Sequence, residues 1–365
     1  MNLATVVVAM SGGVDSSLTA ALLKEQGYRV IGINMRLHGS GSEDEEQNYS
    51  LSKSCCSLVE LEDARKVCQQ IGIPFYAMNF EEEFRQAVID YFVAEYRRGR
   101  TPNPCVACNA ILKFRFLLHK ALALGADYLA TGHYCRNVLD ETSGNYKLLR
   151  AKDPSKDQSY VLYMLNQKQL SQVIFPLGTF HKSETRQMAA ERGLVVANKA
   201  ESMDICFVAG GDYRDFIKRN LGAQRDLPGP IVNTAGQVVG QHQGLTAYTV
   251  GQRKGLGALN NHATYVLKLV PESNTLIVGE DSELRSSELK ATQVNWVAGE
   301  WPTAPVRATI KVRYKAKEIP GRVIPLDPSQ QSVHILLDEP QRAITPGQAV
   351  VFYQGEEVLG GGIIQ

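Results

Sequence analysis

Short apolar runs alternate with helical patterns from the N-terminus to about residue 135. The pattern predicts strands at Val6–Val8, Tyr28–Met35, Ile73–Met78 and Tyr128–Thr131, and helices at Leu18–Gln26, Glu60–Gln70, Glu81–Arg98 and Leu112–Leu124. Strands that alternate with helices are typical of a parallel, doubly wound α/β sheet. Such sheets bind their ligands beyond the carboxyl ends of the strands. We therefore expect chemistry in the loops after Val8, Met35 and Thr131.

The pattern changes in the second half of the chain. A hairpin is predicted over 136–149, around Ser143-Gly144-Asn145, and further helices over Lys182–Arg192 and Tyr213–Leu221. From about Pro228 onward, short β-prone runs are separated by turn signals such as Thr345-Pro346-Gly347. This spacing favours small β domains. We expect a catalytic α/β domain over 1–210, a small central β-rich domain over 211–285 and a C-terminal β-barrel-like domain over 286–365.

Bulk composition is that of an ordinary globular chain, with 44% hydrophobic residues, 21% charged residues and a net charge of +1 over 365 residues. No apolar run approaches the ~18 residues of a membrane span, and the N-terminus lacks the features of a signal peptide. Cysteine is present seven times, an odd number, at 55, 56, 68, 105, 108, 135 and 206. That usage argues against a secreted disulfide scaffold and predicts a cytoplasmic protein with a few working thiols.

The most informative stretch is the turn Ala9–Ser17, which joins the first strand to the first helix. Gly12 and Gly13 allow close approach of the backbone, and Ser11, Ser16 and Ser17 add hydroxyl donors. Free backbone N–H groups and the positive end of a helix dipole would converge there, which suits phosphate. Asp15 would repel a bare phosphate, so it either acts through Mg²⁺ or orders the loop. The Gly-Lys-Ser/Thr ending of a Walker A loop is missing.

A second informative stretch is Thr101–Asn109, which carries Cys105 and Cys108. Two prolines make its first part stiff and non-helical, so both thiols lie at the start of the following helix. A thiol at a helix N-terminus ionises more easily. A Cys-x-x-Cys pair has three interpretations: half of a zinc site, a redox pair, or a nucleophile with a neighbour. A structural zinc site would need a second closely spaced pair, and the sequence has none.

Cys206 lies in the segment Ser202–Phe207, just before Gly210-Gly211. A lone cysteine is more often a buried core residue. The combination with a phosphate loop and a second loop cysteine favours a working thiol here.

These stretches resemble the motifs of two known groups of proteins. The loop Ser11-Gly12-Gly13-Val14-Asp15-Ser16-Ser17 resembles the pyrophosphate loop of the PP-loop ATPases, which cleave ATP between the α and β phosphates. An ordered set of segments also resembles the bacterial tRNA-specific 2-thiouridylases of the MnmA (TrmU) type over essentially the whole chain. The set is Ala9–Ser17, Thr101–Asn109, Ala130–Tyr134, Asp153–Tyr160, Ser202–Phe207, Tyr248–Gly257 and Val312–Tyr314.

The resemblance implies the reaction, the partners and the site residues. ATP, with Mg²⁺, would adenylate the C2 oxygen of the wobble uridine (position 34), and a cysteine persulfide loaded by a sulfur relay protein would supply sulfur. The family suggests the tRNAs for lysine, glutamate and glutamine, and we expect a monomer. Cys206 would hold the persulfide and Cys108 would be the catalytic nucleophile. ATP would be bound by Ala9, Met10, Ser11, Gly12, Gly13, Val14, Asp15, Ser16, Met35 and Gly132. The target base would face Asn103, Pro104 and Cys105, and the rest of the tRNA would contact His133, Lys156, Asp157, Gln158, Arg313, Tyr314 and Gln348.

One residue departs from the family pattern. Many members carry aspartate after Asn-Pro, where this chain has Cys105. A thiol titrates in a different pH range from a carboxyl, which leaves the acid–base role open. Cys105, Cys108 and Cys206 would also form a three-thiolate set able to hold an iron–sulfur cluster, an alternative that we do not favour. Two other functions stay open: an amide-forming ligase of the argininosuccinate or GMP synthetase type, and a non-enzymatic RNA-binding or sulfur-carrier protein.

Basic residues gather in two regions beside the predicted tRNA contacts. They outnumber acidic residues seven to two over 85–120 and six to one over 307–322. Over 311–317 basic side chains alternate with Val312, Tyr314 and Ala316, which predicts a cationic row on one face of a strand. A solvated edge strand protected by lysines is the alternative.

Overall fold

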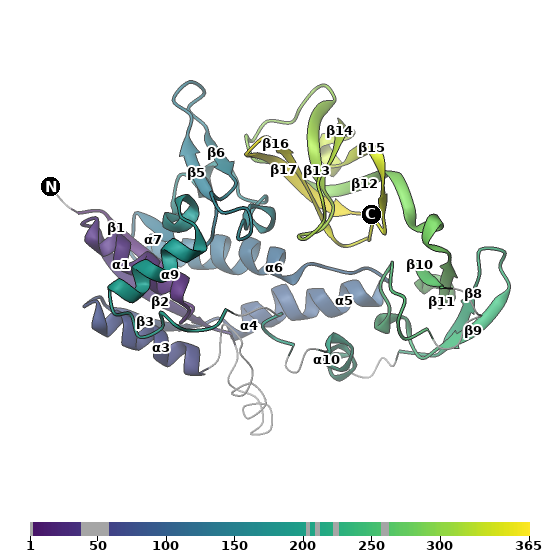
Figure 1. Ribbon diagram of the computed structural model, residues 1–365, viewed down its shortest axis with the longest axis horizontal. Helices are drawn as coiled ribbons and strands as arrows, with labels where there is room; N and C mark the ends of the chain where they lie inside the picture. The colour runs from purple at the N-terminus through teal and green to yellow at the C-terminus, as the bar shows by residue number, and fades with distance from the viewer. Residues whose placement is uncertain (1–2, 38–57, 202–204, 209–211, 222–225, 257–262) are drawn as a thin grey trace.

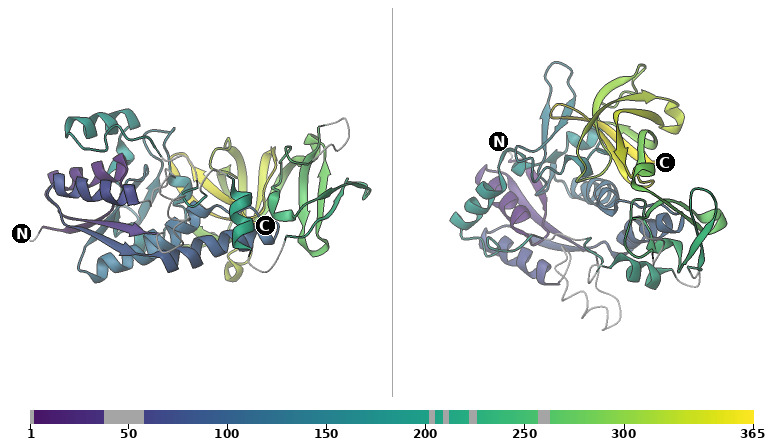
Figure 2. Two further views of the ribbon diagram at one scale, coloured as in Figure 1. Left: turned by 90° about the horizontal axis from the view of Figure 1, so that it is seen from below. Right: turned by 45° about the vertical axis from the view of Figure 1, so that its right-hand side comes forward.

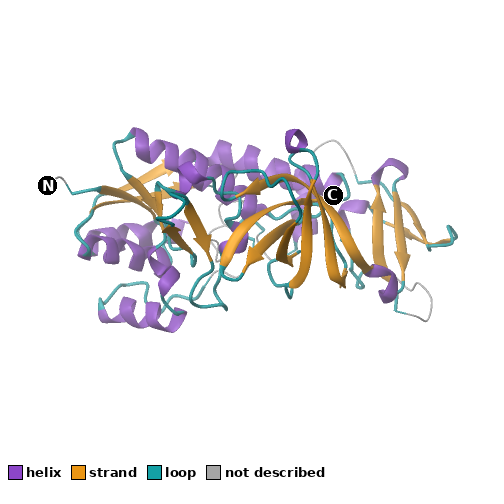
Figure 3. Ribbon diagram, turned by 90° about the horizontal axis from the view of Figure 1, so that it is seen from above, coloured by secondary structure: helices purple, strands orange, loops and turns teal. Residues whose placement is uncertain are grey.

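The computed structural model describes residues 3–37, 58–201, 205–208, 212–221, 226–256 and 263–365. The strands of these residues form three β-sheets (Figure 1). Figures 2 and 3 show the C-terminal barrel lying between the N-terminal α/β sheet and a small sheet at the far end. Among the helices of the described ranges, none combines the length and the apolar character that a membrane crossing requires.

The N-terminal sheet has five parallel strands in the order β3-β2-β1-β4-β7, as the strand–helix alternation predicts. Its strands are β1 (Thr5–Ala9), β2 (Arg29–Arg36), β3 (Phe75–Asn79), β4 (Tyr128–Ala130) and β7 (Val173–Ile174). The chain order reverses between β1 and β4, so the switch point lies beside the Ala9–Ser17 loop. Ligands of doubly wound sheets bind at this position.

Helices cover both faces of this sheet (Figure 3). On β1, Val7 faces one hydrophobic core, while Val6 and Val8 face the other. This alternation follows from the period of two in a strand. The core beside Val6 and Val8 includes α1 (Val14–Glu25), α3 (Leu58–Gln70) and α9 (Lys182–Glu191).

The opposite face is covered by two long helices, each with a π-helical segment in its middle. The first consists of α4 (Glu81–Phe84), the π-helical residues Arg85–Asp90 and α5 (Tyr91–Arg97). The second consists of α6 (Pro104–Ala107), the π-helical residues Cys108–Leu117 and α7 (Leu118–Ala123). The sequence predicts both helices, but the second begins eight residues before the predicted Leu112. The described residues also form two short helices, α8 (Gln167–Leu170) and α10 (Tyr213–Asn220).

The C-terminal strands form a closed antiparallel barrel in the order β12-β15-β14-β13-β16-β17, with β12 and β17 paired. They are β12 (Arg285–Trp296), β13 (Val306–Lys311), β14 (Ile319–Pro325), β15 (Val333–Arg342), β16 (Ala349–Gln354) and β17 (Glu357–Ile364). The predicted hairpin forms β5 (Arg136–Leu139) and β6 (Tyr146–Leu149). It extends the barrel sheet, because Leu149 of β6 pairs with Glu357 of β17. The hairpin therefore ties the α/β region to the barrel.

The remaining sheet has four strands in the order β10-β11-β8-β9. They are β8 (Gly229–Val232), β9 (Val238–His242), β10 (Tyr265–Val270) and β11 (Thr275–Gly279). The end of α5 lies against it, since a Cβ added at Gly99 would come within 3.0 Å of Leu269.

The predicted cationic strand over 311–317 is wrong. Strand β13 ends at Lys311, and residues 312–316 form bends and turns. The Arg313 guanidinium donates to the Ala343 carbonyl and to Thr345 Oγ1, while the Tyr314 hydroxyl donates to the Asp157 carbonyl at 3.0 Å. Because these bonds hold both side chains against the protein, basic residues in this segment do not share one strand face.

Candidate active site

The Ala9–Ser17 loop connects β1 to α1 at the switch point of the parallel sheet. Gly12 has φ +75°, and a Cβ there would lie 2.1 Å from the Glu60 carbonyl oxygen. Only glycine fits both the backbone conformation and the space. Gly13 is the N-cap residue of α1, and it has no side chain that could accept from the N–H groups of the first turn. Those N–H groups can therefore donate to a ligand.

Hydroxyl groups of the loop are held by short local hydrogen bonds. Ser16 Oγ lies 3.2 Å from both the N and the Oγ of Ser11, and Ser17 Oγ donates to the Gly13 carbonyl at 2.8 Å. The Met10 carbonyl accepts a buried bond of 2.7 Å from Asn34 on β2. The predicted ATP residue Gly132 also lies against the loop, because a Cβ there would be 2.8 Å from Ser16 N. Met35 lies on β2, in the strand adjacent to β1.

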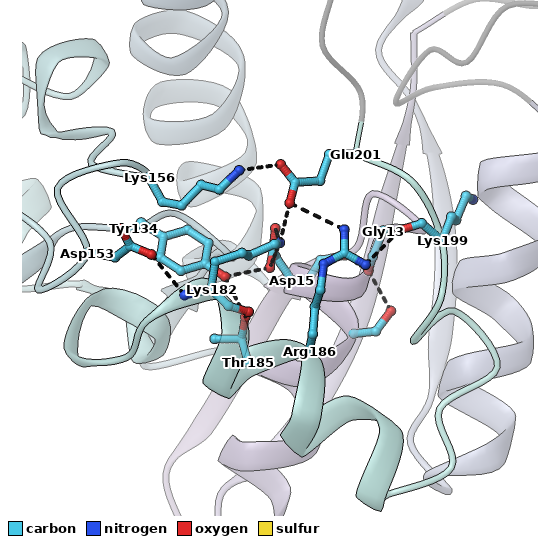
Figure 4. Close-up of polar contacts among 12 residues, drawn as sticks. Gly13, Asp15, Tyr134, Asp153, Lys156, Lys182, Thr185, Arg186, Lys199 and Glu201 are labelled. Carbon is cyan, nitrogen blue, oxygen red and sulfur yellow. Dashed lines mark hydrogen bonds and ion pairs between the residues drawn. The ribbon is translucent and has the colours of Figure 1, made fainter.

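Asp15 is neutralised by other side chains of the protein (Figure 4). The Lys182 ammonium donates to both its carboxylate oxygens, at 2.6 and 2.7 Å, and the Tyr134 hydroxyl donates to it at 2.8 Å. Burial, together with the Asp15 charge, raises the pKa of the Tyr134 phenol, so that group keeps its proton. Of the two roles expected for Asp15, ordering the loop is the one that these contacts support.

Two further charged residues support the loop. Lys199 Nζ donates to the Gly12 carbonyl at 3.1 Å and pairs with Glu60 at 2.8 Å and Asp63 at 2.5 Å. Glu201 accepts from Lys156 at 2.6 Å and lies 3.4 Å from both Lys182 and Arg186. Burial raises the pKa of Glu201, but the bond from Lys156 and the charges of Lys182 and Lys156 outweigh burial and lower it to about 2. The carboxylate is therefore ionised throughout the neutral range.

The thiol-bearing helix begins as the prolines predict. The Asn103 side chain caps α6, accepting from the N–H groups of Cys105 at 3.1 Å and Val106 at 3.3 Å. The helix leads into β4, and Lys113 lies 3.5 Å from His133, just beyond the carboxyl end of that strand. Residues 104–108 therefore extend beyond the carboxyl edge of the sheet, on the side of the Ala9–Ser17 loop.

Cys108 and Cys206 lie half-buried against one hydrophobic core. The neighbour of Cys206, Phe207, is fully buried, with its ring centroid 5.3 Å from that of Phe92 and 5.0 Å from that of Phe216. Cys105, in contrast, is exposed. Within the described ranges, no group of three or more His, Cys, Asp or Glu side chains could hold a metal ion. The cluster hypothesis for Cys105, Cys108 and Cys206 stays untested.

The predicted tRNA contacts all have partners within the protein. His133 is buried between the rings of Phe114 and Phe175, and burial with the nearby Lys113 charge lowers the pKa of its imidazole well below the usual range. Buried Asp157 accepts from the N–H groups of Ala151 and Ser159. The remaining contacts within the protein are Gln158 to Tyr134 N, Lys156 to Glu201, Tyr314 to Asp157, Arg313 to Ala343, and Gln348 to Thr101. Their contact with tRNA stays a prediction.

Comparisons with known proteins cover the whole chain. Residues 4–210 match a family model described as a tRNA methyl transferase HUP domain, 214–280 a tRNA methyl transferase PRC-barrel domain, and 286–364 an aminomethyltransferase beta-barrel domain. The chain is 49% identical to the tRNA-specific 2-thiouridylase MnmA of Roseiflexus castenholzii, covering 99% of both chains. It is 52% identical to the MnmA of Geobacter metallireducens, covering 98% of this chain and 96% of that one. The chain belongs to the MnmA family.

The structure places four side chains around the Ala9–Ser17 loop to which the sequence analysis assigned no role there. These are Lys182, Tyr134, Lys199 and Glu201 (Figure 4). Lys182 was predicted only as the first residue of a helix. Nothing local in the sequence indicates that its ammonium reaches Asp15, which lies 167 positions earlier.

Proposed function

We propose that this chain is a cytoplasmic enzyme that uses ATP to convert the wobble uridine (position 34) of tRNA to 2-thiouridine. The named relatives are tRNA-specific 2-thiouridylases, and the match extends over both chains. The observation that carries the proposal is the placement of the glycine-rich loop and the thiol-bearing start of α6 beyond the same sheet edge. Phosphate-binding and thiol groups in one place suit a reaction that activates an oxygen and replaces it with sulfur.

The residues present fit ATP. The uncapped first turn of α1 offers N–H donors, the loop offers serine hydroxyls, and Lys182 adds positive charge beside Asp15. Mg²⁺ is commonly held by one or two carboxylates together with substrate phosphates, and it would neutralise phosphate charge. Asp15 is the carboxylate of the Ala9–Ser17 loop, but both its oxygens accept from Lys182, so it would hold Mg²⁺ only after Lys182 releases one of them.

The proposed reaction balances in three steps. The C2 oxygen of uridine bonds to the α-phosphorus of ATP, and pyrophosphate leaves. The terminal sulfur of a Cys206 persulfide bonds to C2, and AMP leaves with the former carbonyl oxygen. The Cys108 thiolate then attacks the Cys206 sulfur, which forms a Cys108–Cys206 disulfide and leaves the outer sulfur on C2. An external thiol reductant supplies two electrons to restore both cysteines, and a relay protein delivers the next persulfide.

The tRNA must present its base outside the anticodon stack to reach such a site. Asn103, Pro104 and Cys105 stand at the start of α6, and Cys105 is exposed there. We propose that these residues face the uridine, and that the substrates are the tRNAs for lysine, glutamate and glutamine. Cys105 takes the position of the family's aspartate, so a thiol would do any proton transfer assigned to that position.

Mass spectrometry of nucleosides tests the proposal. Unmodified tRNA is incubated with the protein, Mg·ATP and a persulfide source, and 2-thiouridine is expected at the wobble position. Cys206→Ser and Cys108→Ser should abolish product and keep ATP binding, while Cys135→Ala should keep activity because Cys135 is fully buried in the core. An amide-forming ligase would not need either thiol. Absence of 2-thiouridine with the wild-type protein would overturn the proposal.

A further inference from the structure

Lys182 places a nearly buried ammonium beside the nucleotide loop. It is the first residue of α9, and its side chain is only 10% exposed. Its Nζ lies 2.6 and 2.7 Å from the two oxygens of Asp15 and 3.4 Å from Glu201 (Figure 4). Asp15 belongs to the first turn of α1, where the free N–H donors of the loop converge. The ammonium is therefore directed at the phosphate-binding end of the site.

The backbone of Lys182 is fixed, so only its side chain can change partner. Its N–H donates to Asp153 at 3.0 Å, and the Glu184 carboxylate accepts from the His181 N–H at 2.5 Å at the start of α9. The ring of Tyr134 lies 5.4 Å from the ammonium, which favours a cation there. A cation held in a poorly solvated place needs anionic partners, and in this structure Asp15 and Glu201 supply them.

Lys199 also contacts the Ala9–Ser17 loop, but its hydrogen-bond partners differ from those of Lys182. Its three acceptors are the Gly12 carbonyl, Glu60 and Asp63. An ammonium has three N–H donors, so these acceptors match its full capacity, and one of them is loop backbone. The acceptors of Lys182 are all carboxylate oxygens. Asp15 provides two of them, and a phosphate oxygen can replace one without leaving a backbone carbonyl unpaired.

We propose that Lys182 binds the pyrophosphate portion of ATP, and that Asp15 and Glu201 hold its ammonium in place before the nucleotide arrives. The inference rests on the proposed use of ATP. An ammonium within reach of the loop offsets the negative charge that the phosphates bring, at a site where water screens poorly. Exchange of one Asp15 oxygen for a phosphate oxygen keeps two hydrogen bonds and the ion pair with Glu201 on the Lys182 ammonium, and it leaves Asp15 with its Tyr134 partner.

Calorimetric titration with two nucleotides tests this role. The probes are α,β-methylene-ATP, which carries all three phosphates, and AMP, which lacks the pyrophosphate portion. For Lys182→Met we expect affinity for the triphosphate to fall about tenfold or more, with AMP affinity retained within about twofold. Lys182→Arg should recover part of the loss, because it restores the charge. Arg186→Met is the matched control, since Arg186 lies one turn along α9 and also pairs with Glu201.

The outcomes separate a phosphate ligand from a structural lysine. Equal losses for both nucleotides, or no loss for either, would overturn the role of Lys182 while the proposed thiolation stands. If Lys182→Met does not fold, the double variant Asp15→Asn/Lys182→Met removes both charges of the pair and is titrated against Asp15→Asn in the same way. A wild-type protein that binds no triphosphate and makes no 2-thiouridine would overturn the proposed function and this inference together.

Discussion

Lys156 donates to Glu201 at 2.6 Å, and the same carboxylate lies 3.4 Å from the ammonium of Lys182. Lys156 is a predicted tRNA contact, and Lys182 is proposed to bind ATP. One carboxylate therefore joins a residue assigned to the RNA with a residue assigned to the nucleotide. Glu201 also directly precedes the segment that carries Cys206. Its charge thus bears on both the predicted RNA contact and the proposed ATP contact.

Glu201→Gln should destabilise the protein in a pH-dependent way. The folded-state pKa of Glu201 is lowered from 4.5 to about 2, so its stabilising contribution is complete above about pH 4.5 and is lost as the pH falls toward 2. We expect the variant to lose about 1–2 kcal/mol near neutral pH, and the difference from wild type to shrink near pH 3. Urea unfolding at both pH values measures it. Glu141→Gln, at an exposed hairpin turn, is the control. A difference that stays constant with pH would contradict the assignment.

Gly12→Ala should damage the loop more than a positive φ alone explains. Gly12 and Gly144 have φ of +75° and +73°, but a Cβ meets the Glu60 carbonyl at 2.1 Å in the first and nothing within 4 Å in the second. Gly144→Ala is the control. The left-handed backbone costs about 1–2 kcal/mol of folding free energy in both Gly12→Ala and Gly144→Ala. The clash adds about 1–3 kcal/mol for Gly12→Ala only. We expect Gly12→Ala also to lose the rise in melting temperature that Mg·ATP gives the wild type. Equal unfolding free energies for the two variants would contradict the close packing against Glu60.

Local patterns predicted the parts of the site that local physics determines. The buried strand at Val6–Val8, the glycine-rich turn after it and the helix start near Cys105 and Cys108 each depend on a few neighbouring residues. Contacts between distant segments were not predictable in this way. The pairing of Leu149 with Glu357 and of Asp15 with Lys182 leaves no periodic signal in either segment.

The cationic strand shows how tertiary contacts override a local pattern. Residues 311–317 alternate basic and other side chains, which by itself favours a strand. Tyr314 instead bonds to Asp157 in the α/β region, and Arg313 bonds to Ala343 and Thr345. These partners lie far away in sequence, and they turn the chain just after Lys311.

Alkylation should rank the described thiols by burial. Cys105 is exposed at a helix N-terminus, whereas burial raises the pKa of Cys68 to about 12 and that of Cys135 well above its ordinary value. Because the thiolate is the reactive form, iodoacetamide should modify Cys105 first, Cys108 and Cys206 more slowly, and Cys68 and Cys135 hardly at all. Peptide mass spectrometry over time measures the order. The same reaction in urea, where all should react, is the control. Rapid modification of native Cys68 would contradict the predicted order.

Gln348→Ala should slow thiolation without weakening tRNA binding. Gln348 was predicted to contact tRNA, but its Nε2 donates to the Thr101 carbonyl at 2.9 Å. The Thr101 N–H in turn donates to the Pro346 carbonyl at 2.8 Å. The barrel therefore holds the segment that leads into Asn103 and the thiol-bearing helix. Loss of that hold should misplace the start of α6, and a shift of about 1 Å can lower a rate ten- to a hundredfold.

Two measurements distinguish positioning from RNA contact at Gln348. Single-turnover thiolation at saturating tRNA should fall about tenfold, while the dissociation constant for tRNA, from filter binding, should stay within about twofold. Gln341→Ala is the matched control. Gln341 also lies in the barrel, and within the described residues its side chain donates to the carbonyl of its neighbour Arg342 and not to the segment before α6. If tRNA binding weakens and the saturated rate is unchanged, Gln348 contacts the RNA directly. In that case the bond to Thr101 is incidental to catalysis.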